Sequence, residues 1–581
     1  RAWRRCGRSH LRHRFQWNFP IAFSQHDPDV LFVAAERVFR SDDLGRSWTA
    51  ISGDLTRNDK SRMGSSGGPI TKDNTSIEVY GTIFALEESP LTAGELWAAS
   101  DDGLVHVSRD NGENWSNITP RGMPEWATVN AIALSTHAPG RAFIAAHRYR
   151  QDDFAPYLFR TNDYGKTWTR LTSGSNGIPA DHFVRAVVED PDRQGLIYVG
   201  TEYGMYVSFD DGRAFQPLQL NLPVTPITDL KIKQQDLIVA TQGRSLWILD
   251  DLTPLHQMSD QVARAEQHLF TPRPAVQFLG GGGNAPRGVP AGKNPAYGAW
   301  IYYTLPAGLD EDGEDVAEVT LDILDGEGEV LRSLSSKEGE YTSPNIWRRL
   351  FPEFFEPRTL TAHEGMNRYV WDLRLGDPKM VDDAVLWGGP RGPEVVPGTY
   401  QARLAVGEWS QTVSFEVQAD PRLDVAQEAH EARFALAYEV YQDLIQSHEL
   451  IRQARAVRDQ AKAIAAVSGN DVIKGMAKSL TERLEKVETS VLQTKAKAPQ
   501  DVLNFTPMLD NQLLYLQNIV ESATGEPTAS SVEMFNVLAA ELADIEAELV
   551  EILSNDLKEF QNLVDSAELD RVIVPTASAS N

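Results

Sequence analysis

The chain has 581 residues, of which 41% are hydrophobic, enough for several separate cores but too polar for a membrane protein. Acidic residues outnumber basic ones by 82 to 55, and the net charge of -27 repels nucleic acid and anionic lipid. The one cysteine, Cys6, excludes an intramolecular disulfide. We therefore predict a multidomain protein with no nucleic-acid partner, no membrane insertion and no disulfide framework.

The two ends of the chain differ from the rest in composition. Six arginines lie in residues 1–14, and we expect this basic leader to be disordered, with an arm that binds an anionic partner as the alternative. Residues 568–581 are expected to form a disordered tail. The sequence has no apolar run of 18 or more residues and no signal-type segment, so the residues themselves leave the compartment open.

A short motif recurs four times in the first half of the chain. Its frame is S/T-x-D-x-G-x-x-W/F, and the copies begin at Ser41, Ser108, Thr161 and Ser208. Their spacing matches the length of a four-stranded propeller blade. Apolar β-rich runs such as Leu96–Ser100 surround each copy, and a fifth unit ends near Asp251 without the glycine and aromatic residue of the motif. We predict about five β-propeller blades over residues 15–265, the last a degenerate closing blade.

The aspartate of the motif invites a catalytic interpretation, but four equivalent copies cannot all serve one reaction centre. We expect a structural role instead. The aspartate accepts backbone N–H bonds, the glycine supplies a positive φ and the aromatic ring packs against a neighbouring strand, which makes a self-capped hairpin. The residues concerned are Ser41, Asp43, Gly45 and Trp48; Ser108, Asp110, Gly112 and Trp115; Thr161, Asp163, Gly165 and Trp168; and Ser208, Asp210, Gly212 and Phe215.

Function is expected at the opposite ends of the blades, where the turns between strands B and C and the crossovers from strand D to strand A ring the channel. Polar residues around a concavity suit a carbohydrate or peptide ligand, although such turns are polar in any propeller. The candidate ligand-binding residues are Arg37, His147, Arg148, Tyr203, Gln242 and Arg244, with Trp126 from a crossover. The candidate catalytic acids are Glu36, Asp101, Asp102 and Glu202.

A second region begins near Pro272, where the repeat stops. Alternating strands at 300–304, 319–324, 369–373, 399–404 and 413–417, with a hairpin turn at Asp325-Gly326, predict an antiparallel, immunoglobulin-like β-sandwich over residues 266–421. Helical periodicity then predicts a helical bundle over residues 422–567. The fold class is therefore mainly β with an α domain.

Two features of the bundle sequence make specific predictions. Capping boxes at Asp424–Gln427 and at Ser530–Glu533 mark the starts of two helices. The apolar stripe from Phe535 to Ile552 predicts a helix that packs along its whole length against a partner. That partner lies either in this chain or in a second copy.

With these motifs, the chain resembles the bacterial proteins of the BNR (Asp-box) repeat type, whose propeller is similar to that of sortilin and which are often named glycosyl hydrolases. The resemblance covers about residues 15 to 251 through the four motif copies and the run Gly243–Asp251. It implies export to the periplasm or the cell exterior, and further blades preceding the first. If a neighbouring blade is missing, Trp17, Phe19, Phe23 and Phe32 are expected to be exposed, and an open edge or the bundle could mediate self-association.

Two functions remain open. The first is a propeller that binds peptide, protein or glycan on the B–C turn face. The second is a glycoside hydrolase of the Asp-box type acting on a polysaccharide, because xyloglucan-acting hydrolases and sialidases resemble this chain at the blade level. The F/Y-R-I-P motif of sialidases is absent from the sequence. No spaced metal-ligand motif and no phosphate loop is present either, so we expect no metal and no cofactor.

Overall fold

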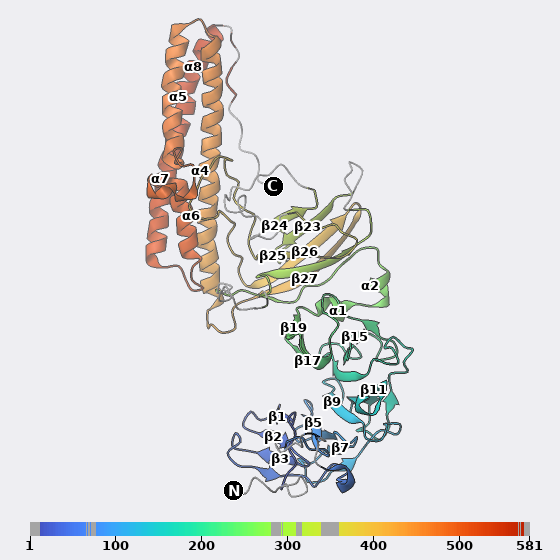
Figure 1. The fold of residues 1–581 in the computed structure, drawn as a ribbon. Helices are drawn as coiled ribbons and strands as arrows, with labels where there is room; N and C mark the ends of the chain where they lie inside the picture. The colour runs from blue at the N-terminus through green and yellow to red at the C-terminus, as the bar shows by residue number, and fades with distance from the viewer. Residues whose placement is uncertain are drawn as a thin grey trace. The chain divides into compact units, whose positions relative to one another are not determined.

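The computed structural model describes residues 12–64, 67, 70, 77–279, 292, 294–309, 317–337, 359–567, 569 and 571–573 (Figure 1). The chain forms two compact units, Arg1–His256 and Gln257–Asn581, and each is described by itself. Most of the leader and of the tail that we expected to be disordered lies outside the described residues.

The first unit consists of five antiparallel sheets that follow one another along the chain. The first four have four strands and the fifth has three, and in every sheet the strands lie in chain order. They are β1 (Ile21–Phe23), β2 (Leu31–Ala34), β3 (Val38–Ser41) and β4 (Thr49–Ala50); β5 (Ile83–Glu88), β6 (Leu96–Ser100), β7 (Val105–Ser108) and β8 (Ser116–Asn117); β9 (Thr128–Leu134), β10 (Ala142–Arg148), β11 (Asp153–Thr161) and β12 (Thr169–Arg170); β13 (Val184–Glu189), β14 (Ile197–Thr201), β15 (Met205–Ser208) and β16 (Gln216–Pro217); and β17 (Ile227–Lys233), β18 (Asp236–Thr241) and β19 (Leu246–Leu249).

These sheets are the blades of a propeller. Residues of the first strand of every sheet line one central cavity of about 1290 Å³. Four apolar clusters fill the spaces between successive blades, from the first pair to the fourth. Among the described residues no cluster joins the fifth blade to the first, so the fifth blade does not act as the expected closing blade.

The outermost blade faces are therefore open. Ile21 and Phe23 of β1 are 59% and 63% exposed, and Leu246 and Ile248 of β19 are 69% and 58% exposed. Trp17 is exposed as expected for an open side, and Phe19 is half-buried. Phe32 is buried, because it belongs to the cluster between the first two blades.

Each Asp-box motif forms a hydrogen-bonded turn between the third and fourth strands of its blade. In the third copy Thr161 donates its hydroxyl to Asp163 Oδ1 at 2.8 Å, and the Thr167 N–H donates to the same oxygen at 2.8 Å. The Gly165 N–H donates to Thr161 Oγ1, and Gly165 has a φ of 76°. The Tyr164 N–H donates to Gly140 O in the turn between strands A and B, so both turns lie at the same end of the blade.

The aromatic residue of the motif reaches further than a self-capped hairpin requires. The indole N–H groups of Trp115 and Trp168 donate to Ile51 O and Ile118 O of the preceding blade, at 3.0 and 2.7 Å. Trp48 in the first blade instead donates to Gly45 O of its own turn at 3.1 Å. The motif therefore joins successive blades as well as closing its own turn.

The second unit begins with a two-sheet sandwich. One sheet contains β20 (His268–Leu269), β22 (Ala299–Leu305) and β25 (Gly365–Trp371). The other has the order β21 (Ala275–Val276), β27 (Trp409–Gln418), β26 (Gly398–Val406), β23 (Val319–Leu324) and β24 (Val330–Ser335). The buried side chains of both sheets, Trp371 and Phe415 among them, form one core.

One strand departs from the predicted antiparallel sandwich. Strand β21 pairs in parallel with β27, so the expectation was wrong at this edge. A two-residue strand that enters the sheet from an irregular segment is not held antiparallel by a hairpin. The predicted hairpin itself is present, because Asp325 Oδ1 accepts the N–H groups of Glu327 and Glu329 in the turn between β23 and β24.

Helices fill the rest of the second unit (Figure 1). The long ones are α4 (Gln427–Val467), α5 (Asp471–Val491), α6 (Leu509–Val520) and α7 (Ala529–Glu551), and α7 continues through a π-helical turn (Ile552–Asp556) into α8 (Leu557–Ser566). Two short helices, α1 (Thr253–Gln257) and α2 (Asp260–Arg264), precede the sandwich. None of the described helices is both long and apolar enough to cross a membrane.

Both predicted capping boxes were wrong. Helix α4 begins at Gln427, three residues after Asp424, and its N-cap residue Ala426 has no side chain to cap it. Helix α7 is capped by the hydroxyl of Thr528, which accepts the Ser531 N–H, so it begins before Ser530. The predicted stripe of α7 does find its partner within this chain, because Leu538, Leu542 and Leu549 share one core with α4 and α5.

Candidate functional site

A groove of about 730 Å³ lies at the end of the blades opposite the Asp-box turns. Turns that follow the second strand of a blade supply part of its wall, and crossovers between blades supply the rest. We call it the turn-face groove. Its lining residues are Gln16, Ser61, Arg62, Gly64, Glu78, Val79, Tyr80, Phe84, Asp101, Trp126, Thr128, His147, Arg148, Arg150 and Gln151.

Trp126 provides an aromatic surface in this groove. It lies in the turn from Pro124 to Ala127, which is closed by a backbone hydrogen bond of 3.2 Å, and it has a φ of 63°. A positive φ at the third position of a turn normally requires glycine or asparagine, so this tryptophan is held in a strained conformation. The Tyr80 ring lies 6.3 Å from it, and the Arg62 guanidinium carbon lies 4.1 Å from its ring centroid.

Asp101 is the one predicted catalytic acid that lines the groove. Its Oδ1 accepts the N–H groups of Gly81 and Thr82 at 3.0 and 2.8 Å, and its Oδ2 accepts the Thr82 hydroxyl. Burial and the neighbouring Asp102 raise the pKa of Asp101 to about 7, although the hydrogen bonds from Thr82 oppose the rise. This carboxyl group is therefore partly protonated at neutral pH.

The other three predicted acids are committed to structural contacts. Asp102 accepts the Ser100 hydroxyl at 2.6 Å and the Arg57 N–H at 2.8 Å. Glu202 forms an ion pair of 2.5 Å with Arg185 and lines the central cavity instead of the groove. Neither side chain faces the turn-face groove.

Glu36 is the most thoroughly engaged of these acids. Its carboxylate accepts the Arg14 N–H at 2.8 Å and contacts His13 Nδ1 at 3.0 Å and Arg37 Nε at 3.1 Å. Burial raises its pKa, but the hydrogen bonds from Arg14 and His13 outweigh burial, so the pKa lies below its ordinary value. A buried, paired carboxylate with a lowered pKa stabilises the first blade and is poorly suited to exchange protons with a ligand.

The predicted ligand-binding residues divide into two sets. His147, Arg148 and Trp126 meet in the turn-face groove. The His147 ring is buried against Tyr149 and Phe183, and burial lowers its pKa to about 3, so it is neutral. Four others lie outside the groove: Arg37 pairs with Glu36, Tyr203 contacts the tilted ring of His182, Gln242 lines the central cavity and Arg244 is exposed beside Gly243.

The central cavity carries charge of both signs. Lys231 of β17 forms an ion pair with Glu87 of β5 at 3.4 Å, which links the fifth blade to the second. Burial raises the pKa of Glu87, Lys231 opposes the rise and Asp229 adds to it. Lys231 and Glu87 neutralise each other, and the aromatic residues Phe23, Phe84 and Tyr149 also line this cavity.

One cluster of side chains in the described part of the first unit has metal-like spacing. The ligand atoms of Asp190, Asp192 and His256 lie within 4.8 Å of one another. Asp190 is already occupied, because Oδ1 accepts the N–H groups of Asp192 and Arg193 and Oδ2 accepts the Tyr198 hydroxyl and contacts His256 at 2.8 Å. We assign no metal to this cluster.

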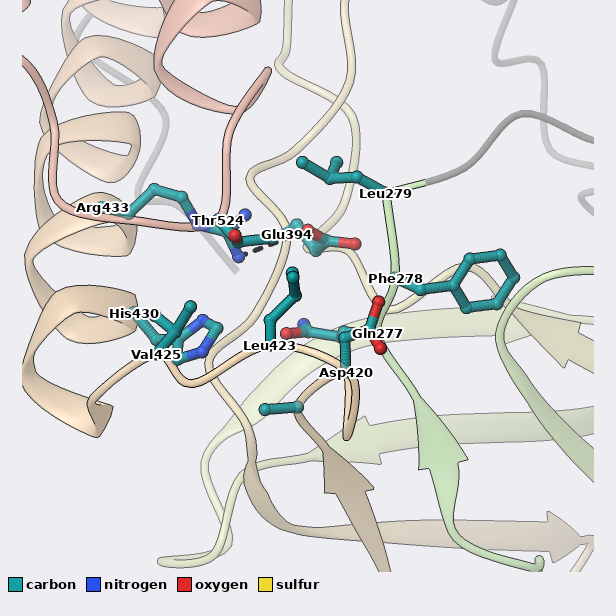
Figure 2. Close-up of a pocket in the computed structure, with 11 residues that line it drawn as sticks. Gln277, Phe278, Leu279, Glu394, Asp420, Leu423, Val425, His430, Arg433 and Thr524 are labelled. Atoms are coloured by element: carbon teal, nitrogen blue, oxygen red, sulfur yellow. Dashed lines mark hydrogen bonds and ion pairs between the residues drawn. The ribbon is translucent and has the colours of Figure 1, made fainter.

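A small cavity of about 10 Å³ lies in the second unit, where α4 faces the sandwich (Figure 2). Arg433 donates to Glu394 at 3.4 Å in its wall. Among the described residues, neither ring nitrogen of the buried His430 has a hydrogen-bond partner, and neither has Gln277 Oε1. The cavity is the size of a single water molecule and is too small for a sugar.

Sequence reasoning missed several residues of the groove, among them Tyr80, Glu78, Arg150 and Gln151. Tyr80 and Glu78 belong to the crossover between the first two blades, whose sequence has no repeat. Arg150 and Gln151 follow β10 in a short 3₁₀ turn, two to three residues beyond the position compared between blades. Extending that comparison past the end of strand B would have found them.

Comparison with known proteins places the chain near xyloglucan-acting enzymes. It is 30% identical to the oligoxyloglucan-reducing end-specific xyloglucanase of Emericella nidulans over 115 residues, 19% of this chain and 13% of that enzyme. It is 25% identical to the xyloglucanase Xgh74A of Acetivibrio thermocellus over 172 residues, 30% of this chain and 19% of that enzyme. The matches thus span less than a fifth of each curated relative, and no family model matches the chain.

Solved structures give weaker similarity. The GH74 xyloglucanase of Xanthomonas campestris has a TM-score of 0.32 and 14% identity, with 68% of this chain and 63% of that chain covered. The β-propeller domain of Cps50 (Swd1) from Myceliophteria thermophila has a TM-score of 0.30 and 15% identity, with 57% of this chain and 90% of that chain covered. The assignment of the five sheets as propeller blades therefore depends on their strand order and packing.

Proposed function

We propose that the first unit binds a polysaccharide in the turn-face groove and that the chain is of the glycoside hydrolase type. The observation that carries the proposal is that Trp126 and Asp101 line the same groove, which combines an aromatic surface with a carboxyl group whose pKa burial raises to about 7. Aromatic rings bind sugar faces, and a carboxylic acid with a raised pKa can protonate a glycosidic oxygen. The sequence similarity to xyloglucanases supports a polysaccharide over a peptide.

The groove also offers a second carboxylate for hydrolysis. Glu78 is exposed and lines the same groove as Asp101. In the proposed reaction Asp101 donates a proton to the leaving glycosidic oxygen as its bond to the anomeric carbon breaks. Glu78 accepts a proton from the water that forms the new bond to that carbon. A polysaccharide of this kind places the protein outside the cell, which agrees with the expected export.

Binding and turnover are tested separately on the full chain. Calorimetry with xyloglucan oligosaccharides measures affinity, and mass spectrometry detects new reducing ends. Trp126→Ala is expected to weaken binding about tenfold, as is typical for loss of an aromatic contact of about 1.4 kcal/mol. Tyr515→Ala, which removes an exposed aromatic ring from helix α6, is the matched control and should bind like the parent.

Three outcomes are informative. Turnover that Asp101→Asn and Glu78→Gln abolish while binding persists supports hydrolysis by this pair. Binding that depends on Trp126 without turnover leaves a polysaccharide-binding module. Absence of binding to xyloglucan, cellulose, pectin and mannan alike would overturn the proposal.

A further inference from the structure

We propose that the turn-face groove selects an acidic polysaccharide, a polyuronate, over a neutral glucan. The inference rests on the proposed function and names its substrate class. It follows from the guanidinium groups that line the groove, Arg62, Arg148 and Arg150, and from the weak compensation of their charge by acids.

Arg62 is held over an aromatic ring and donates no hydrogen bond to a carboxylate among the described residues. Its guanidinium carbon lies 4.1 Å from the centroid of Trp126, and a nearby second guanidinium, that of Arg57, lies 4.9 Å from the same ring. The nearest acidic partner of Arg62 is Asp59 at 3.9 Å, and both side chains are substantially exposed. Contact with the ring restricts the guanidinium, and its N–H groups make no hydrogen bond that a planar carboxylate would have to displace among the described residues.

Arg150 also lies over an aromatic ring, and it lines both the groove and the central cavity. Its guanidinium carbon lies 4.8 Å from the Tyr149 ring centroid, and its side chain is exposed. It forms no ion pair with any acid among the described residues. Arg148 differs, because it donates to Gln151 at 2.7 Å and lies 3.8 Å from Asp153. Arg62 and Arg150 therefore each lie over an aromatic ring and donate no hydrogen bond to a carboxylate among the described residues.

The acids of the groove do not balance these cations. Glu78 is exposed and lines the groove. Asp101 is partly protonated at neutral pH because burial raises its pKa to about 7, and its oxygens already accept three hydrogen bonds. His147 is neutral because burial lowers its pKa to about 3. Three arginines and two acids line the groove, so its lining residues carry an excess of basic groups in a chain whose overall charge is -27.

A uronate residue matches this arrangement better than a neutral sugar or a phosphate. Its ring presents a face for Trp126, and its carboxylate is planar and can accept two parallel N–H bonds from one guanidinium. In a uronate, the ring and the carboxylate belong to the same sugar. In the groove, Trp126 and Arg62 are likewise in contact with each other. A neutral glucan offers no carboxylate to the guanidinium groups of Arg62 and Arg150.

The main comparison is between polygalacturonate and its methyl ester, which share a backbone and differ in charge. Calorimetry on the full chain uses polygalacturonate, its fully methyl-esterified form, xyloglucan and dextran sulfate. Polygalacturonate is expected to bind at least about tenfold more tightly than the methyl ester, and added salt should weaken it. Arg62→Gln and Arg150→Gln should each remove most of this preference. Arg213→Gln, an exposed arginine in an Asp-box turn, is the matched control and should keep it.

Each other outcome overturns the inference in a distinct way. Equal binding of xyloglucan and polygalacturonate, lost in Trp126→Ala, would refute the acidic preference and leave the proposed function standing. Equal binding of dextran sulfate would show attraction to charge without carboxylate recognition. Failure to bind any of the glycans would refute both proposals. The comparison of the two galacturonan forms needs only the parent protein, so it decides the question even if a variant misfolds.

Discussion

Two ionisable side chains of the helical bundle are completely buried without pairing. His448 of α4 and Asp510 of α6 lie with Nε2 and Oδ2 3.7 Å apart, too far for a hydrogen bond. Among the described residues neither of these two atoms has another partner. Burial raises the pKa of Asp510 to about 8 and lowers that of His448 to about 3. Both groups are therefore neutral at pH 7.

This pair makes the stability of the bundle depend on pH. The folded-state pKa of Asp510 lies above the unfolded value of about 3.9, so the folded state binds the extra proton. The stabilisation is fully present below about pH 4 and is lost as the pH rises through about 8. We predict that Asp510→Asn is more stable than the parent and that its advantage widens from pH 5 to 8, by at most about 1.4 kcal/mol per pH unit.

Urea unfolding of both proteins at four pH values between 5 and 8 measures this difference. Asp471→Asn, at an exposed position at the start of α5, serves as the control and should show a constant difference from the parent. An Asp510→Asn advantage that stays constant with pH would mean that Asp510 is ionised throughout this range.

The candidate site was only partly predictable, for reasons visible at single residues. The position after strand B drew attention to Asp101, His147 and Arg148, which line one groove in the structure, because that position is set by local repetition. The sequence could not distinguish Asp101 from Glu36, since the difference comes from Arg14, whose N–H reaches Glu36 from 22 residues away. It likewise could not pair Trp126 with Arg62, because their crossovers belong to different blades.

The Asp-box turn is the element that the sequence predicts best. The prediction of its role was incomplete, because it did not include the contact with the preceding blade. Its internal bonds join residues within seven positions, so the motif alone specifies them. The contact of its tryptophan with the preceding blade depends on where that blade lies, which the motif does not encode. The capping-box predictions were wrong for a related reason. A short polar pattern does not determine the residue at which a packed helix begins.

The inter-blade bond makes the copies of the motif unequal in stability. We predict that Trp168→Phe destabilises the first unit by about 1–2 kcal/mol, because it removes the N–H that Ile118 O accepts and leaves a partly buried carbonyl unpaired. Trp48→Phe should cost less than about 0.5 kcal/mol, since Trp48 is 41% exposed and bonds only to its own turn. Urea unfolding followed by circular dichroism compares the two variants. Equal losses would show that the bond between blades contributes nothing.

At the scale of the whole molecule, each blade packs against the next blade along the chain. Each of the four inter-blade clusters uses apolar residues of two neighbours, so every inner blade is covered on both faces. The first and fifth blades each keep one face without such a cluster among the described residues. The fold of the individual blades follows from local repetition, whereas the arc that they form follows from these contacts between distant positions.

These open faces lead to the last prediction. Exposed apolar side chains on a sheet face favour association, so the purified chain should self-associate with rising concentration in sedimentation velocity. Amide exchange in β1 should be faster than in β13, which is covered on both sides. Ile21→Glu combined with Phe23→Glu should reduce association, because charged side chains on a bare face repel a partner and stay hydrated. Val224→Glu, which places a charge at an equally exposed loop position, should leave association unchanged. A monodisperse chain whose β1 exchanges as slowly as β13 would show that the face of the first blade is covered in solution.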